Sequence, residues 1–114
     1  MSEEGIKFDS GKPEFSLIPP FALEEVAKVL TFGAKKYKPN NWKYVPDAEK
    51  RYHDAIYRHL NAYTKGEEFD SETNLHHLAH AICCAMFIID LKANKSNAEP
   101  LSMKRIRILN EELQ

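Results

Sequence analysis

Apolar side chains recur at helical spacing in three stretches of the chain, and polar or turn-forming residues separate these stretches. We predict helices over residues 21–36, 47–65 and 75–93, because apolar residues three or four positions apart mark the buried face of a helix. Pro20 suits the first position of the first helix, Asp47 is a candidate N-cap of the second, and Thr73 or Asn74 can cap the third. The third stretch is apolar on nearly all sides and is expected to be the most buried. No stretch shows a convincing strand pattern.

The segments between and beyond these helices complete the predicted organisation. Residues 1–19 read as an irregular N-terminal segment, because turn residues and two prolines interrupt them. Residues 37–46 hold two prolines, two asparagines and three aromatics, which predicts a loop that packs on the domain or lines a pocket. Residues 94–114 read as a polar C-terminal linker followed by a last helix over 101–113. We expect residues 1–114 to form a single all-α domain, a three- to four-helix bundle.

Composition narrows the class of protein. The 114 residues are 43% apolar and 29% charged, as in a soluble globular domain. The net charge of −1 argues against a partner that is a nucleic acid polymer, but it allows a nucleotide to bind. Cys83 and Cys84 are adjacent in an apolar helix, which predicts reduced thiols and a cytoplasmic protein, in the host cytoplasm if it is phage-encoded. The acidic start is unlike a signal peptide, and the apolar run 79–91 is too short to span a membrane.

The most concentrated chemistry lies where the third helix begins. Four carboxylates precede three histidines there: Glu67, Glu68, Asp70, Glu72, His76, His77 and His80. Carboxylates and imidazoles bind divalent metals and carry protons. His77 and His80 share one helix face, whereas His76 points elsewhere. A solvated acidic loop beside two structural histidines is the alternative, and the concentration of both residue types favours a metal site.

The second predicted helix supplies the facing half of this site. His59 lies on its apolar side and is placed to meet His77 or His80. Asp54 and Arg58 are four residues apart, so they either contribute to the site or form a simple salt bridge along the helix.

Two further groups have both a structural and a ligand-binding interpretation. Lys35 and Lys36 end the first helix, where cations suit the helix dipole or a phosphate group. Asn41 and Trp42 are either turn and packing residues or a base pocket, in which an indole stacks on the base and an amide reads its edge. The chain has no Gly-rich phosphate loop and no evident nucleophile, and phosphoanhydride cleavage by a metal-activated water requires neither.

Six motifs together resemble one known family. They are residues 7–13 (KFDSGKP), residues 32–37 (FGAKKY), Asn41-Trp42, Arg58-His59-Leu60, Gly66-Glu67 with Asp70 and Glu72, and residues 77–81 (HLAHA). In this order and spacing they look like the phage-type dATP/dGTP diphosphohydrolases, called MazZ-like, which are relatives of the all-α MazG-like nucleoside triphosphate pyrophosphohydrolases. The resemblance covers roughly residues 6–91.

The resemblance implies a helical bundle that assembles into homodimers or homotetramers. It also implies Mg²⁺- or Mn²⁺-dependent conversion of a purine deoxynucleoside triphosphate to the monophosphate and pyrophosphate. MazG relatives hold their metals on ExxE and ExxD motifs of facing helices, and the central helices of this chain lack both motifs. The segments 54–59 and 77–80, helped by the acidic loop, are the expected counterparts.

The roles expected of individual residues follow from both lines of reasoning. Metal binding is assigned to Asp54, Asp70, Glu72, His77 and His80. Catalytic roles are assigned to His59 or Glu67 as general base, and to Arg58. Lys35 and Lys36, with Arg58, would neutralise the triphosphate, and Asn41 and Trp42 would hold the base.

Two other functional classes stay open at this point. An HD-type nucleotide phosphohydrolase would release triphosphate or phosphate, and His53-Asp54 is the one adjacent His-Asp pair in the sequence. A non-enzymatic helical phage adaptor or nucleotide-binding protein would bind nucleotide without turnover. The product of the reaction separates these classes.

Overall fold

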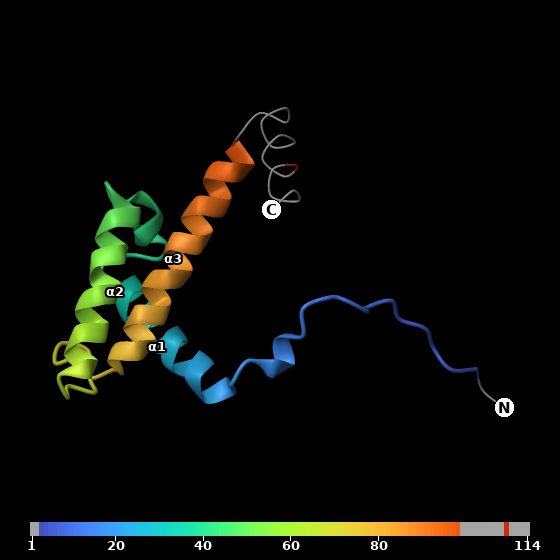
Figure 1. Cartoon of the computed structure of the whole chain (residues 1–114), viewed down its shortest axis with the longest axis horizontal. Coiled ribbons are helices and arrows are strands. Elements are labelled where there is room, and N and C mark those ends of the chain that lie inside the picture. The colour runs from blue at the N-terminus through green and yellow to red at the C-terminus, as the bar shows by residue number, and fades with distance from the viewer. Residues whose placement is uncertain (1–2, 99–108, 110–114) are drawn as a thin grey trace.

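The computed structural model describes residues 3–98 and Leu109, and within these residues the regular structure is helical (Figure 1). The helices are α1 (Pro20–Lys36), α2 (Ala48–Thr64) and α3 (His77–Ala98), with two 3₁₀ turns, η1 (Phe15–Leu17) and η2 (Asn41–Tyr44). The predicted all-α class is confirmed, and the arrangement is consistent with the MazG-like type. None of the helices in this part of the chain is long and apolar enough to cross a membrane.

The boundaries of α2 follow partly from local sequence. The helix ends in a Schellman motif, in which Gly66 has a φ of 103° and donates its N–H to Tyr63 O at 3.0 Å. The N–H of Glu67 completes the motif by donating to Ala62 O at 3.0 Å. The predicted end of the helix is thus confirmed. Asp47 occupies the N-cap position, as predicted, but it adopts a left-handed conformation and its side chain makes no capping hydrogen bond.

Helix α3 begins two residues later than predicted and ends later. His76 takes the capping role expected of Thr73 or Asn74, since its Nδ1 accepts the N–H of Leu78 at 3.0 Å. The helix continues through residues 94–98, so the predicted linker there is wrong: no glycine or proline interrupts the sequence before Pro100. The predicted C-terminal helix, residues 101–113, lies outside the described residues apart from Leu109.

Helix α3 is the common support of the other two helices. Val26 and Val29 of α1 pack against Ala79 and Cys83 of α3, and α2 lies along another side of α3 (Figure 1). Within the described part of the chain, α1 and α2 make little direct contact with each other. The two helices therefore form walls, and α3 forms the floor between them.

Helix α3 is the most buried element, as predicted, but it is not buried on every side. The helix does contribute most of the buried apolar residues, but Ile82, Met86 and Ile89 are 46%, 46% and 69% exposed in the single chain. The physical reason is that two neighbouring helices cannot enclose a third on every side. Ile82, Met86 and Ile89, which are four and three residues apart, therefore form an apolar row that faces outward.

Candidate functional site

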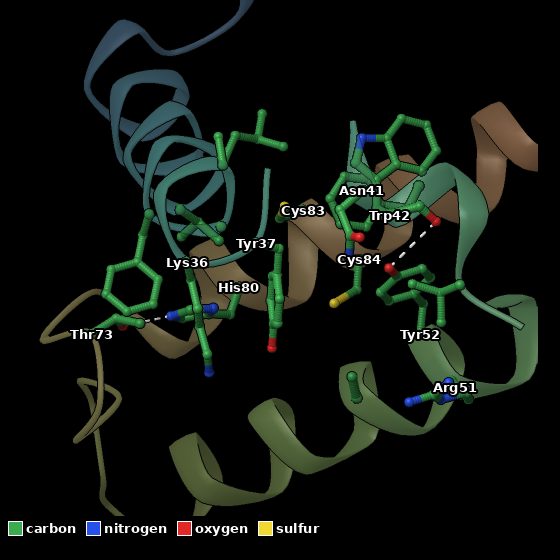
Figure 2. A pocket seen from close by; sticks show the side chains of 18 of the residues that line it. Lys36, Tyr37, Asn41, Trp42, Arg51, Tyr52, Thr73, His80, Cys83 and Cys84 are labelled. Carbon is green, nitrogen blue, oxygen red and sulfur yellow. Dashed lines mark hydrogen bonds between the residues drawn. The ribbon is translucent and has the colours of Figure 1, made fainter. Parts of the chain in front are cut away.

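A cleft of about 860 Å³ runs between α1 and α2 above α3 (Figure 2). Its two ends differ in chemistry: one holds imidazoles, carboxylates and cations, and the other holds mainly aromatic rings, with Asn40, Asn41 and Arg51. A cleft of this size suits a small-molecule ligand. Cys83 and Cys84 lie between the ends as free thiols. Burial raises their pKa values to about 12 and about 11, so both thiols are protonated and are poor nucleophiles.

A group of side chains suited to a metal ion lies at the polar end, where His59 and Asp70 line the cleft and the buried His77 adjoins them without lining it. One ligand atom from each of His59, Asp70 and His77 lies within 4.8 Å of the other two. His59 Nδ1 and His77 Nδ1 are 2.8 Å apart. Two ligands at right angles on a metal with bonds of about 2.0–2.1 Å stand about 2.9 Å apart, so this spacing fits adjacent positions around one ion. The donor set of two imidazoles and a carboxylate therefore fits a divalent metal.

The loop after α2 fixes the position of Asp70. Backbone hydrogen bonds from Asp70 N to Leu75 O and from His77 N to Glu68 O close the loop into a narrow turn. Asp70 Oδ1 accepts the N–H groups of Glu72 and Thr73 at 2.9 and 3.0 Å. Among the described residues, no hydrogen bond uses Oδ2, which leaves this oxygen available to a ligand. The loop thus holds the carboxylate with one oxygen and presents the other.

His80 supports the group from one turn further along α3. Its Nε2 lies 2.7 Å from Thr73 Oγ1, and its ring stacks on His59 at 4.6 Å between centroids. The contact with Thr73 engages the Nε2 nitrogen, so His80 holds the His59 ring and the loop rather than belonging to the three-residue group. Thr73 was missed by sequence reasoning. The spacing of Asp70 and Thr73, typical of an Asp side chain that caps the next turn, was the available signal.

Glu67 lies next to His77, on the Nε2 side of its ring. Its Oε1 is 3.1 Å from His77 Nε2, although the direction is not that of a good hydrogen bond, and this nitrogen is otherwise buried without a partner. A carboxylate beside Nε2 favours the proton there and leaves the Nδ1 lone pair free for a metal. Glu67 does not line the cleft. The neighbouring Glu68 pairs with a different histidine, His76, whose Nε2 lies 3.5 Å from its carboxylate.

The electrostatics favour the protonation states that metal binding requires. Burial, with the nearby His80 and His77 rings, lowers the pKa of His59 to about 4. Burial also lowers the pKa of His80. For Asp70, burial opposes ionisation, but the N–H groups of Thr73 and Glu72 outweigh it and the net pKa is lowered. At neutral pH the group thus combines a neutral His59 imidazole with an ionised Asp70.

The lowered pKa of His59 predicts acid destabilisation of the metal-free protein. The unfolded chain binds a proton at this imidazole near pH 6.5 and the folded chain only near pH 4, so the stabilising contribution is present above about pH 6.5 and is lost as the pH falls to about 4. We expect the melting temperature to fall over this range. A His59→Gln variant should show a shallower fall, and an equally steep fall in both proteins would contradict the assignment to His59.

Cations lie along the same end of the cleft. Lys36 and Arg58 both line it, one from each wall. Lys36 Nζ forms an ion pair with Glu72 Oε1, which joins the end of α1 to the loop across the cleft. Both side chains are largely exposed, so this pair stabilises the fold little and yields easily to a competing anion.

Some residues predicted to belong to the site lie away from this end of the cleft. Asp54 points away and pairs with Lys50 at 3.0 Å, and neither residue lines the cleft. Lys35 also lies outside the lining. His53 stacks edge-on against Tyr57 on the exposed side of α2, so the His53-Asp54 pair is not placed as an HD-type site would need.

The aromatic end contains Asn41 and Trp42, as predicted for pocket-lining residues. The Trp42 ring stacks on Phe87 of α3 at 4.4 Å with an interplanar angle of 11°. Tyr52 packs edge-on against the same Phe87 at 5.0 Å, and its hydroxyl donates to Trp42 O at 3.5 Å. These contacts pin η2 to α3 and shape the far end of the cleft.

Comparison with known proteins gives a consistent result. The family model described as dATP/dGTP diphosphohydrolase, N-terminal, matches residues 2–100. A dATP/dGTP diphosphohydrolase of Salmonella phage PMBT28 is 44% identical over 95 residues, which cover 83% of this chain and 32% of that protein. The chain thus spans about a third of the length of this relative. No solved structure matches the chain.

Proposed function

This chain belongs to the dATP/dGTP diphosphohydrolase N-terminal family, and we propose that it hydrolyses purine deoxynucleoside triphosphates to the monophosphate and pyrophosphate. The observation that carries the proposal is the group of His59, Asp70 and His77, of which His59 and Asp70 line one end of a nucleotide-sized cleft. Metal-binding residues beside cations suit a triphosphate, and the aromatic end suits a base.

We assign the metal to His59, Asp70 and His77. A Mg²⁺ or Mn²⁺ ion there would polarise a phosphate oxygen and acidify a water. Imidazole nitrogen is a softer ligand than Mg²⁺ prefers, so Mn²⁺ suits this donor set better. The assignment makes His59 a ligand rather than a general base, because its Nδ1 lies beside that of His77.

Other side chains take supporting roles in this proposal. Lys36 and Arg58 would bind the triphosphate oxygens, and an arriving phosphate would draw Lys36 away from Glu72. The released Glu72 carboxylate lines the cleft and is then available as a further ligand or as the base that takes a proton from water. Glu67 would orient His77 rather than touch the substrate, because it lies at Nε2 and outside the cleft lining.

We also propose that the protein is a homodimer or homotetramer. The apolar row of Ile82, Met86 and Ile89 and the 73% exposed Phe21 are a costly surface for one chain of this size. A second copy covering them would bury this surface. A solution mass equal to one chain of 13.2 kDa by light scattering would contradict the proposal.

The proposed activity has a direct test. Purified protein is incubated with each of the four deoxynucleoside triphosphates in Mn²⁺ or Mg²⁺, and the products are separated by ion exchange. We expect monophosphate and pyrophosphate from dATP and dGTP, faster with Mn²⁺ than with Mg²⁺, and little product from the pyrimidines. Triphosphate or orthophosphate would favour the HD-type reaction instead. Binding without any product would favour a nucleotide-binding protein.

A further inference from the structure

The rings at the aromatic end of the cleft are not equally available to a ligand. Trp42 has one face covered by Phe87 at 4.4 Å, and Lys43 Nζ lies 5.5 Å from the centroid of the same indole. Tyr52 is half-buried between the Trp42 carbonyl and Phe87. These rings pack η2 against α3. A base that stacked on either ring would have to compete with the contacts that hold it in place.

Tyr37 differs from these rings in exposure and in position. It follows the last residue of α1, its N–H donates to Gly33 O at 3.0 Å, and its side chain is 63% exposed while lining the cleft. No aromatic ring elsewhere in residues 3–98 stacks on it. Figure 2 shows the ring edge-on in the middle of the cleft, with Lys36 and His80 towards one side and Asn41 and Tyr52 towards the other. Both faces of the ring are therefore turned along the cleft.

The position of Tyr37 relates the two ends of the cleft. Lys36 Nζ lies 5.3 Å from the Tyr37 centroid, and the same Lys36 is paired with Glu72 at the metal-binding end. A nucleotide with its phosphates at Lys36 would lead its base past Tyr37 towards Asn41. An aromatic ring offers its π-face to a base, and the Asn41 amide offers both a donor and an acceptor to the base edge.

From this geometry we propose that Tyr37, rather than Trp42, is the ring on which the purine base of the substrate stacks. The inference rests on the proposed nucleotide hydrolysis and deepens it by separating a base site from the phosphate site. Tyr37 binds the base on its face directed towards Asn41, and Trp42 acts indirectly by holding η2, and with it Asn41, against α3.

Binding measurements on two probes test the inference. The first probe is a non-hydrolysable dGTP analogue, and the second is inorganic tripolyphosphate, which has the phosphates without the base. Dissociation constants are measured by calorimetry with Mn²⁺ for wild type, Tyr37→Ala, Tyr37→Phe and Tyr44→Ala. Tyr44 is included because it is another strongly exposed tyrosine that lines the cleft. Tyr57→Ala is the matched control, because Tyr57 is similarly exposed on α2 and lies outside the cleft.

We expect Tyr37→Ala to weaken the dGTP analogue about 10-fold and to leave tripolyphosphate unchanged, since loss of one base–aromatic stack has effects of this size. Tyr37→Phe should keep wild-type affinity for both probes. Unchanged analogue binding in Tyr37→Ala, an equal loss for both probes, or the same loss in Tyr44→Ala would each overturn the inference. A wild-type protein that binds neither probe would instead overturn the proposed function itself, and the stacking role with it.

Discussion

Replacement of His77 by glutamine is expected to lower hydrolysis of dGTP at least about 100-fold, because partners that merely orient a metal ligand already contribute 10- to 100-fold. His77 is 4% exposed, and its Nδ1 lies 2.8 Å from His59 Nδ1. Glutamine has a similar volume, so the start of α3 should keep its structure while the imidazole nitrogen ligand is lost. Initial rates with Mn²⁺ measure the effect, and Mn²⁺ titration followed by calorimetry shows whether affinity falls in parallel.

The matched control for this variant is Asp54→Asn. The sequence also predicted Asp54 to bind metal, but its carboxylate pairs with Lys50 on the exposed side of α2. The variant should keep wild-type rates and wild-type affinity for Mn²⁺. A large loss in Asp54→Asn, or full activity in His77→Gln, would mean that the metal is held by a different set of residues.

Two substitutions of Asp70 are expected to separate its structural role from its ligand role. Asp70→Ala removes the acceptor of the Glu72 and Thr73 N–H groups. Because hydrogen bonds to a charged group stabilise a fold more than neutral ones, we expect the free energy of unfolding to fall by about 2 kcal/mol or more. Asp70→Asn keeps an oxygen in the Oδ1 position and should stay within about 1 kcal/mol of wild type. Urea unfolding of the metal-free proteins measures both values.

Metal binding, unlike stability, should be weakened in both variants. Both lack the carboxylate charge, so both should bind Mn²⁺ at least about 10-fold more weakly than wild type. Thr73→Ser retains the backbone N–H and a hydroxyl and serves as the control for disturbance of the loop. If Asp70→Asn were as unstable as Asp70→Ala, the charge rather than the hydrogen bonds would hold the loop. Wild-type affinity for Mn²⁺ in Asp70→Asn would exclude this carboxylate as a ligand.

Much of the backbone could be predicted from the sequence because its signals are local. Helical spacing of apolar residues, Pro20 at the start of α1 and Gly66 after α2 each act within a few residues, and the structure agrees with all three. The errors arose where a second local signal competed. His76 caps α3 in place of Thr73 or Asn74, and α3 continues through polar residues 94–98 that no helix breaker interrupts.

Local pattern also indicated which residue types would come together between the helices. The spacing of His77 from the acidic loop, and the place of His59 on the apolar side of α2, indicated that imidazoles and carboxylates would converge. The choice among the acids was beyond local reasoning. Asp54, Glu67, Glu68, Asp70 and Glu72 are equivalent in charge and in their nearness to a histidine.

By itself, the sequence determined the helical class, the ends of α1 and α2, and the pool of residues from which a metal site could be built. Only the tertiary structure decided that Asp70 joins His59 and His77, while Glu72 pairs with Lys36 and Glu67 stands behind His77. The physical reason is that ligand selection depends on distances between atoms from different helices and a turn. Those distances are fixed only once α3 has packed against both α1 and α2, and periodicity along a single helix carries no information about them.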